Sequence, residues 1–505
     1  MEKEMERLSS FATTTFEILA SLIAILFIVG AIYIAVIYVI DRSQTKQAIR
    51  HNFPVIGRMR YFFEHLGEFF RQYFFAMDRE ELPFNRAERS WVYRAAKDME
   101  STVAFGSTRD LWKPGTVIFG NCPFPQLSVD FAEPGEVTIG PACKNPYKTR
   151  SIINISGMSY GAISKPAVRA LSNGARLAGC WMNTGEGGLS PYHLEGNCDI
   201  VFQIGTAKYG VRDHEGNLDL TKLKEIASHE QVKMFEIKLA QGAKPGKGGM
   251  LPAAKVNEEI ARIRGIPVHT DSISPNRHPD IGSVHELLDK INEIRDITGK
   301  PVGFKTVLGA RGWMDDLFLA INEQGLDRAP DFITLDSGDG GTGAAPMSLI
   351  DNVGLPIRTS LALLTNKLTQ YELRDRIKVI TSGKLITPVG VAWALATGAD
   401  FVVSARGFMF SIGCIQALQC NKNTCPTGIT THDKDLQSGL NPEDKAVRVR
   451  NYVKNMVHEV GVIAHSCGVS EPRQLRRMHA YIVSPQGRAI PLDELYSPDS
   501  TYVYT

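Results

Sequence analysis

FITLDSGDGG (332–341), KVITSGK (378–384) and FVVSARG (401–407) share one pattern, in which a short apolar run passes directly into glycine and polar residues. Apolar runs of four to eight residues bounded by turn residues are typical of β-strands. Stretches of helical length separate the three runs, and strands that alternate with helices predict a parallel sheet. The pattern therefore predicts an α/β fold with ligand-binding loops at the carboxyl ends of its strands.

The same alternation extends upstream through five more candidate strands, which are SIINIS (151–156), WMNT (181–184), MFEIKL (234–239), PVHTD (267–271) and VGFKTV (302–307). Eight strands of this kind predict a (β/α)8 TIM barrel rather than an open sheet. IVFQIG (200–205) would make a ninth run, and we assign it to an insertion after the second strand.

The composition fits one large barrel with smaller attachments. The chain has 505 residues, of which 43% are hydrophobic and 22% are charged, and a TIM barrel takes about 250 residues or more. The formal net charge is only +2, so the charge balance does not predict a nucleic-acid partner. The cysteines are few and irregularly spread, which argues against a disulfide framework.

Residues 18–40 form an uninterrupted run of 23 residues without a charge. A membrane-spanning helix needs about 20 apolar residues, so we expect one transmembrane helix here, after an N-terminal tail at 1–17. Asp41 and Arg42 follow the run directly, without the small-residue cleavage site of a secretory signal. Basic residues are concentrated after the run, which predicts a single-pass protein of the cell (inner) membrane with its C-terminal body in the cytoplasm.

Residues 41–140 are expected to connect this helix to the barrel. The segment RYFFEHLGEFFRQYFF (60–75) carries aromatic residues at helical spacing. Such a helix either lies on the bilayer surface or packs against the barrel, and the sequence leaves both interpretations open.

Six glycine-rich segments each follow a predicted strand: SGMSYGA, TGEGG, AQGAKPGKGG, DSGDGGTGA, TSGK and SARG. Glycine lets the backbone approach a ligand closely, and the loops after strands seven and eight commonly bind phosphate in such barrels. Gly383, Lys384, Arg406 and Gly407 occupy these two loops. Lys305 ends a strand inside the barrel, where a buried cation calls for an anionic partner such as a reduced flavin; a solvated strand-end lysine is the alternative.

Several of these strings, together with LRDRIKV (373–379) and CIQALQCNKNTCP (414–426), resemble the synthase domain of glutamate synthase and follow that family's order. The resemblance covers residues 141–436 and implies an FMN-binding barrel, followed by a helical extension and tail at 437–505. It also implies flavin contacts from Met158, Ser159, Lys305, Gly338, Asp339, Gly340, Gly341, Ser382, Gly383, Lys384, Arg406 and Gly407.

Three cysteines, Cys414, Cys420 and Cys425, have the spacing C-x5-C-x4-C after the eighth predicted strand. Zinc sites usually ask for four ligands, often in C-x-x-C pairs, whereas iron–sulfur clusters are held by cysteine thiolates. The spacing is similar to the [3Fe-4S] site of glutamate synthase, so the resemblance implies such a cluster. The alternative is three incidental buried cysteines.

The resemblance implies that 2-oxoglutarate and ammonia form 2-iminoglutarate, which is reduced to L-glutamate with electrons passing from the cluster to FMN. It assigns the dicarboxylate substrate to Lys238, Gln241, Lys244 and Arg264, which suits two carboxylates because fixed cations bind them well. Glu186 is then the candidate for handling ammonia or protons. Surface salt bridges are the alternative role for Lys244 and Arg264.

The sequence departs from the large glutamate synthases in several places. Glu2 follows Met1 and the first cysteine is Cys122, so we expect no glutaminase domain, and ammonia should come from solution or a separate glutaminase. Met250 stands where the large enzymes are expected to carry glutamine. Apart from GDGGTG (338–343), no second dinucleotide signature of the G-x-G-x-x-G kind follows a predicted strand, which predicts an electron donor such as ferredoxin or a reductase subunit.

Two alternatives to the glutamate synthase reaction follow. In the first alternative the same cofactors serve an N-alkyl glutamate or another 2-oxo or imino acid, which Met250 favours and the lysine, glutamine and arginine set opposes. A membrane-tethered electron-transfer flavoprotein is the other possibility, but it leaves the substrate cradle without a use. Product analysis with 2-oxoglutarate and ammonium distinguishes these possibilities.

Overall fold

The computed structural model describes residues 1–130, 132–310 and 312–497, with the side chains of residues 2, 68, 69 and 71 left aside. The chain divides into two units, Met1–Arg86 and Ala87–Thr505. The second unit carries the barrel and the first carries a long apolar helix.

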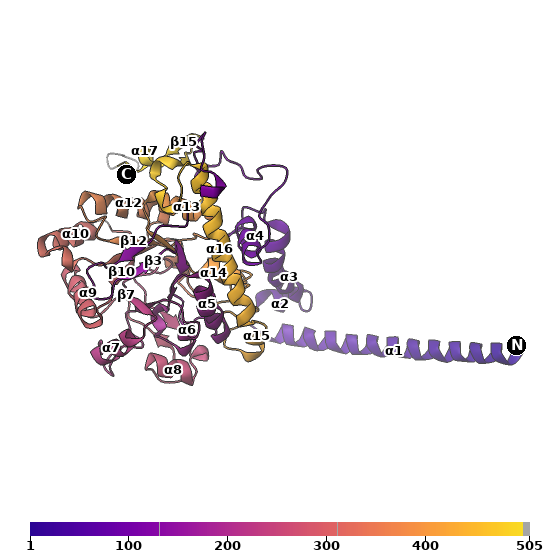
Figure 1. Ribbon diagram of the computed structural model, residues 1–505. Coiled ribbons are helices and arrows are strands. Elements are labelled where there is room, and N and C mark those ends of the chain that lie inside the picture. The colour runs from indigo at the N-terminus through magenta and orange to yellow at the C-terminus, as the bar shows by residue number, and fades with distance from the viewer. Residues whose placement is uncertain (131, 311, 498–505) are drawn as a thin grey trace. The chain divides into compact units, whose positions relative to one another are not determined.

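Eight parallel strands close into a barrel in the second unit (Figure 1). Each is short, and most of its residues are buried, as expected where side chains fill the barrel on one face and helices cover the other. In chain order the strands are β4 (Ile153–Ile155), β5 (Met182–Asn183), β6 (Ile200–Ile204), β7 (Val232–Lys238), β10 (Val302–Val307), β11 (Phe332–Asp336), β12 (Lys378–Thr381) and β13 (Phe401–Ser404). The eight-stranded α/β barrel predicted from the sequence is therefore confirmed.

Two of the predicted strand positions are wrong. IVFQIG (200–205), assigned above to an insertion, supplies the third barrel strand β6, whose five residues are all buried. PVHTD (267–271), expected as the fourth strand, is not a strand; Thr270 Oγ1 donates to Pro267 O across a turn, and His269 has a φ of 56°. The physical reason is that continuous burial marks a parallel strand, whereas proline lacks the N–H that a sheet requires.

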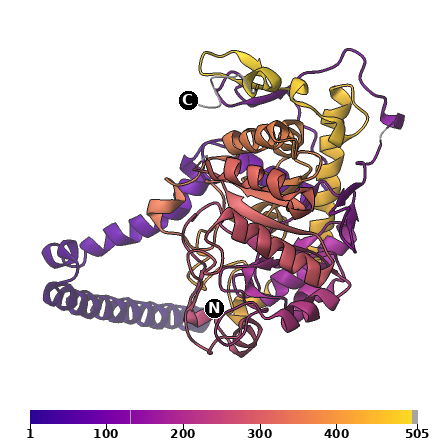
Figure 2. The ribbon, with the colours of Figure 1, turned by 90° about the vertical axis from the view of Figure 1, so that its left-hand side faces the viewer.

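Helices surround the barrel (Figure 2). Their ends follow local rules: Ser164 caps α5 by accepting from Ala167 N, and Gly179 ends it in the left-handed conformation with φ 67°. Gly174 of α5 allows α16 to approach, because a Cβ there would meet the Val449 side chain at 2.4 Å. The helices of this unit are α4 (Arg86–Ala96), α5 (Lys165–Ala178), α6 (Pro191–Glu195), α7 (Leu220–Ser228), α8 (Glu258–Arg264), α9 (Val284–Thr298), α10 (Gly312–Gln324), α11 (Met347–Ile350), α12 (Ile357–Gln370), α13 (Pro388–Thr397), α14 (Arg406–Ser411), α15 (Lys434–Ser438), α16 (Pro442–Ser466) and α17 (Leu492–Leu495).

Small sheets complete the second unit. A hairpin of β2 (Val137–Ile139) and β3 (Tyr147–Thr149) packs Ile139 and Tyr147 into a buried core with Trp181, Phe332 and Phe401, which stand at the amino ends of barrel strands. The remaining strands are β1 (Val117–Phe119), β14 (Ala480–Val483) and β15 (Ala489–Pro491) in one sheet, and β8 (Met250–Leu251) with β9 (Ser272–Ile273) in a two-stranded antiparallel sheet.

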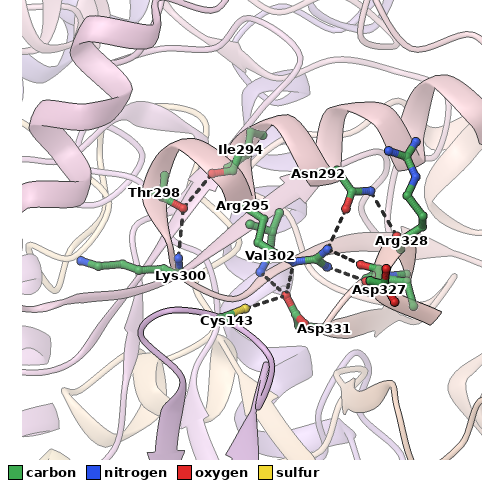
Figure 3. Close-up of polar contacts among 12 residues, drawn as sticks. Cys143, Asn292, Ile294, Arg295, Thr298, Lys300, Val302, Asp327, Arg328 and Asp331 are labelled. Carbon is green, nitrogen blue, oxygen red and sulfur yellow. Dashed lines mark hydrogen bonds and ion pairs between the residues drawn. The ribbon is translucent and has the colours of Figure 1, made fainter. Parts of the chain in front are cut away.

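The amino ends of the barrel strands are also joined by polar contacts around Asp331 (Figure 3). This fully buried carboxylate accepts from Arg295 Nε at 3.0 Å and from Val302 N at 2.9 Å, and the Cys143 thiol donates to it at 3.5 Å. Arg376 forms a second ion pair with it at 3.0 Å. These contacts stabilise the amino end of the barrel. In barrels of this kind the chemistry takes place at the opposite, carboxyl end.

The first unit consists of α1 (Glu2–Ser43), α2 (Ala48–Asn52), α3 (Gly57–Phe70) and a π-helical turn (Arg71–Phe75). Residues Lys3–Ser43 are long and apolar enough to cross a membrane, with a mean hydropathy of 3.0 and 6% burial in the most apolar window. A signal sequence would pass the same test of length and composition.

Candidate active site

The candidate catalytic residues gather where the barrel strands end. Glu186 lies in a 3-10 turn (Gly185–Gly187) after β5, and its carboxylate oxygen is 2.9 Å from Lys238 Nζ at the end of β7. Lys238 also donates to Gln241 Oε1 at 2.6 Å. The lysine therefore joins two loops that follow different strands, and it fixes the position of the Glu186 carboxylate.

Glycine backbone packs closely around this carboxylate. A Cβ at Gly205 would stand 2.5 Å from Glu186 Cβ, and one at Gly249 would stand 2.5 Å from Glu186 Oε1. Any side chain at these two positions would displace the carboxylate. The glycine-rich loops after β6 and β7 thus serve to shape the surroundings of Glu186.

Lys244 and Arg264 complete a cationic group around Glu186, and both side chains are buried. Arg264, the last residue of α8, donates to Ser272 Oγ at 3.0 Å and to Ser159 Oγ at 3.4 Å. Its guanidinium also lies 5.2 Å from the centre of the Tyr209 ring. Arg264 is therefore held in place from several sides, and the surface role considered for it and Lys244 is wrong.

The electrostatics of this group follow from burial and from the neighbouring charges. Burial raises the pKa of Glu186, but Lys238, Lys244 and Arg264 more than offset it, so the pKa lies below its usual value and the carboxylate is ionised. Burial and the charge of Lys238 lower the pKa of Lys244. Three cations surround one carboxylate, which leaves an excess of positive charge to receive an anion.

Lys305 forms a buried ion pair inside the barrel. Its Nζ lies 3.0 Å from Asp336 Oδ2, across the neighbouring strands β10 and β11. Burial lowers the pKa of Lys305, but the charges of Asp336 and Glu236 raise it above its usual value. The lysine is consequently protonated and buried, and the solvated strand-end role is wrong.

Asp336 organises the loops that follow β7, β11 and β12. It accepts from Gly242 N at 3.1 Å and from Ser382 Oγ at 2.5 Å. A Cβ at Gly242 would lie 2.0 Å from Ser337 O, so the loop after β7 and the glycine-rich loop after β11 are in direct contact. The sequence analysis did not select Asp336, although an acid that ends an apolar strand within FITLD is a recognisable signal.

The predicted phosphate cradle is built from glycines under tight constraint. Gly383 has a φ of 137°, and a Cβ there would stand 2.4 Å from Ser337 Cβ. Lys384 follows with a φ of 55° and pairs with Asp339 at 3.0 Å. The loop of Gly338 to Gly341 lies beside them, since Asp339 belongs to it. Within this loop Ser337 Oγ donates to Asp339 and Gly340 N donates to Ser337 O at 2.8 Å.

The remaining flavin candidates border the same end of the barrel. Arg406 opens α14, and a Cβ at Gly341 would stand 2.8 Å from its Nε. Gly407 packs against Tyr452, whose hydroxyl a Cβ would approach to 2.4 Å. Met158 and Ser159 pack against Gly185, because a Cβ there would meet Ser159 N at 2.6 Å. At these positions the backbone packs directly against other protein atoms, so only glycine is accommodated. Lys384 and Arg406 at this end of the barrel would supply cations to the phosphate of a flavin.

Three buried polar residues that the sequence analysis missed lie deeper in the barrel. Glu236 of β7 accepts from Asn183 Nδ2 at 2.8 Å and from Gln203 Nε2 at 2.6 Å. A Cβ at Gly157 would lie 2.9 Å from Asn183 Oδ1. Paired amide and carboxylate groups at strand positions otherwise filled by apolar residues were the available signal.

The cysteine loop brings Cys414, Cys420 and Cys425 near one another. Burial raises the pKa of Cys414 to about 12, and the charges of the other two cysteines add to the rise. Burial also raises the pKa of Cys425, but hydrogen bonds from Thr427 and Thr430 bring it below its usual value. Lys255 Nζ donates to Cys420 O at 2.8 Å, which places a cation beside the loop.

The loop differs from a site for a single metal ion. Within the described residues, no three His, Cys, Asp or Glu side chains converge on one point that would hold a metal. In an iron–sulfur cluster the thiolates bind different irons, so their sulfurs need not converge as they do on zinc. Three neighbouring thiols are the ligand type that an iron–sulfur cluster requires.

Comparisons with known proteins agree with this geometry. The conserved region in glutamate synthase matches residues 121–470. The glutamate synthase large subunit-like protein YerD of Bacillus subtilis (strain 168) is 41% identical, over 95% of this chain and 98% of that protein. The archaeal-type glutamate synthase (NADPH) of Thermotoga sp. (strain RQ2) is 34% identical over 70% of this chain, but the match spans only 66% of its own length. Among solved structures, mandelate oxidase is 16% identical with a TM-score of 0.44, over 78% of this chain and 98% of that chain. The chain belongs to the glutamate synthase family.

Proposed function

We propose that this chain catalyses the reductive amination of 2-oxoglutarate with ammonia to L-glutamate, through 2-iminoglutarate. The observation that carries the proposal is the buried group of Lys238, Lys244 and Arg264 around Glu186. Three cations and one carboxylate leave an excess of two positive charges, which balances the two negative charges of a dicarboxylate. Family membership supports the same reaction.

Each residue of the group has a role in this proposal. Arg264 and Lys244 bind the two substrate carboxylates, since a guanidinium gives paired hydrogen bonds and an ammonium gives a point charge. Glu186 is ionised, so it attracts ammonium and accepts the proton that ammonium must lose before its nitrogen attacks the 2-oxo carbon. After the attack the oxygen takes one proton from the newly bonded nitrogen and the other from the Glu186 carboxyl, so that it leaves as water and the protonated imine remains.

Gly338, Gly340, Gly341, Gly383, Lys384, Arg406 and Gly407 would hold FMN, and Cys414, Cys420 and Cys425 would hold the [3Fe-4S] cluster. When bound, the flavin supplies a hydride to the imine carbon and the cluster supplies electrons singly. Lys305 is buried in the barrel beside Asp336, and it would donate hydrogen bonds to the flavin when that group is bound. Asp336 keeps that lysine oriented.

Met250 supports an alternative substrate. This residue is exposed in the hairpin of β8 and β9, and it directly follows Gly249, whose backbone borders the Glu186 carboxylate. A methionine beside the reaction centre would favour an apolar group on the substrate, such as the alkyl group of an N-alkyl glutamate. The cofactors and the carboxylate-binding residues would be the same.

We further infer that α1 anchors the chain in the cell membrane as a single span, with the barrel in the cytoplasm. The apolar run is long enough to span, and Arg42, Lys46, Arg50, Arg58 and Arg60 follow it, whereas Lys3 and Arg7 precede it. A separate electron-donor protein, such as ferredoxin or a reductase subunit, would supply electrons. Ammonia would come from solution or from a separate glutaminase.

The function is tested by purifying the full chain without oxygen in detergent and supplying reduced viologen dye, 2-oxoglutarate and ammonium. Flavin, iron and L-glutamate are measured on the same sample. Glutamate that forms with the parent chain, and forms roughly ten- to a hundredfold more slowly with Lys244→Ala at low 2-oxoglutarate, supports the proposal. FMN and iron without glutamate would contradict it, and a panel of alkylamines with 2-oxoglutarate would then test the second substrate.

A further inference from the structure

The segment after the apolar helix presents an unpaired apolar stripe. Met59, Phe62, Phe63, Leu66 and Phe70 recur at helical spacing along α3, so they share one face of the helix. Met59, Phe62 and Phe63 are 55–60% exposed. Arg60 and Glu64 lie on the other side of the helix, and the arrangement is that of an amphipathic helix whose apolar face is open.

The apolar surface continues beyond α3. Tyr73, Phe74 and Phe75 in the π-helical turn, and Met77 after it, are all exposed. Large exposed patches of this kind mark interaction sites in proteins, whereas single exposed apolar residues do not. The concentration of aromatic side chains is typical of the boundary between lipid and water, where tyrosine and other amphipathic residues are enriched.

Hydrogen bonds connect this segment to the end of α1, and we call the connection between Asp41 and Arg58 the elbow. Asp41, the first charged residue after the apolar run, is almost fully buried and accepts two hydrogen bonds from Arg58 Nε, at 3.0 and 2.9 Å, and one from Arg58 Nη2 at 2.7 Å. It also accepts from Val55 N at 3.0 Å. Arg50 lies 4.8 Å from the centre of the Tyr61 ring, which connects α2 to α3.

The elbow fixes the depth at which α3 begins. Residues 18–40 span about 35 Å as a helix, at about 1.5 Å per residue, and the hydrocarbon core of a bilayer is about 30 Å thick. If α1 crosses the bilayer, Asp41 lies at its cytoplasmic boundary, and Arg58, which is bonded to Asp41, lies there too. The apolar stripe of α3 therefore begins at the level of the lipid headgroups.

We propose that α3 and the following turn, residues 57–77, form a second membrane-binding element that lies on the cytoplasmic surface of the bilayer. Arg42 and Lys46, which follow the apolar run, and Arg60 of α3 are exposed cations that suit anionic headgroups. The inference rests on the proposed membrane span of α1, and it commits the stripe to lipid rather than to a protein partner. Continuity with α1 and the nearby positive charge favour that occupant.

The test uses the full chain in nanodiscs of phosphatidylcholine and phosphatidylglycerol, prepared with and without brominated acyl chains that quench tryptophan. Three single reporters are compared: Phe62→Trp on the stripe, Glu64→Trp on the opposite face of the same helix, and Phe27→Trp within α1. Each signal is the difference from the parent chain. We expect brominated lipid to quench the reporters at 27 and 62 at least twofold more than the reporter at 64.

The outcomes separate the two proposals. Strong quenching at 27 with equally weak quenching at 62 and 64 would overturn the surface element and leave the span intact. Weak quenching at all three positions would overturn the span and the surface element together. The proposed reaction would not be affected, because glutamate formation is measured separately. Strong quenching at 62 that is lost in Phe62→Trp combined with Met59→Glu and Phe63→Glu would support insertion of the stripe itself.

Discussion

Lys305 Nζ lies 3.0 Å from Asp336 Oδ2, and both side chains are only 8% exposed. The two residues stand on neighbouring strands β10 and β11, and Asp336 also receives hydrogen bonds from Gly242 N and Ser382 Oγ. One carboxylate thus holds the barrel lysine, the substrate loop and the loop of the phosphate cradle. The pair is a structural link between the proposed substrate and flavin sites.

Removing the lysine should therefore be costly. Lys305→Met leaves Asp336 as a buried charge without its cation, and loss of one partner of a buried pair lowers the free energy of unfolding by about 3–5 kcal/mol. Lys148→Met is the control, because its pair with Glu136 is exposed and long at 3.9 Å, so its loss should cost less than about 1 kcal/mol. Denaturant unfolding measures both, and equal losses would contradict the importance of the pair.

Lys244→Ala should weaken use of the dicarboxylate substrate. A hydrogen bond to a charged group contributes about 1.5–3 kcal/mol, so kcat/KM for 2-oxoglutarate should fall roughly ten- to a hundredfold. Lys247→Ala in the same loop is the matched control, since its side chain is exposed. Steady-state kinetics with ammonium in excess measures both variants. A similar fall in the two variants would show that the loop, rather than the Lys244 charge, is responsible.

The same lysine predicts an alkaline limit to substrate binding. Burial and the charge of Lys238 place the pKa of Lys244 below its usual 10.5, so Lys244 loses its proton at a lower pH than a solvated lysine. Its cation is present below that pKa and is lost as the pH rises through it, so KM for 2-oxoglutarate should rise with pH before 10.5. In Lys244→Arg the guanidinium stays protonated, and the rise should move to higher pH. An unchanged KM profile in this variant would contradict the assignment.

The sequence predicted the barrel because parallel strands and glycine-rich loops leave local signals. FITLD, KVITS and FVVSA became β11, β12 and β13 almost residue for residue. PVHTD failed because its apolar and β-branched composition resembled a strand, although Pro267 and the turn at Thr270 prevent pairing. With PVHTD taken as a strand, IVFQIG became a ninth candidate, which a barrel of eight strands does not accommodate.

Part of the candidate site could also be predicted from the sequence. Lys238, Gln241 and Glu186 stood out because the resemblance supplied their roles, and the structure brings them within hydrogen-bonding distance. Glu236 and Asp336 were missed because their importance depends on partners from other strands, at Asn183, Gln203 and Lys305. A single sequence does not show which strands become neighbours, so buried polar pairs emerge only in three dimensions.

Gly383→Ala should impair the phosphate cradle. Gly383 has a φ of 137°, and an added Cβ would stand 2.4 Å from Ser337 Cβ, so alanine requires both strain and movement of the cradle. Gly343→Ala is the control, because no atom lies within 4 Å of the added Cβ. Flavin released by heat from equal amounts of purified protein should fall at least fivefold in Gly383→Ala and stay unchanged in Gly343→Ala. Full flavin content in both variants would contradict the assignment of the Gly383 loop to flavin binding.

Cys420→Ala should remove the iron without removing the flavin. Cys414, Cys420 and Cys425 are the proposed cluster ligands, and a thiolate cluster that loses a ligand is expected to lose its iron. Cys122→Ala is the control, since this cysteine lies outside the loop. Iron and acid-labile sulfide measured on anaerobically purified protein should fall to background only in Cys420→Ala. Equal iron in the two variants would show that the cysteine loop does not hold a cluster.

Incorporation of ¹⁵N-labelled ammonium is the most direct measurement of the proposed reaction. The anaerobic full chain, loaded with FMN and iron, is supplied with reduced viologen, 2-oxoglutarate and ¹⁵N-ammonium, and L-glutamate is isolated and analysed by mass spectrometry. We expect the parent chain to form L-glutamate one mass unit heavier than normal, and Lys244→Ala to form it roughly ten- to a hundredfold more slowly at low 2-oxoglutarate. Absence of labelled glutamate from the loaded parent chain would contradict the proposed reaction.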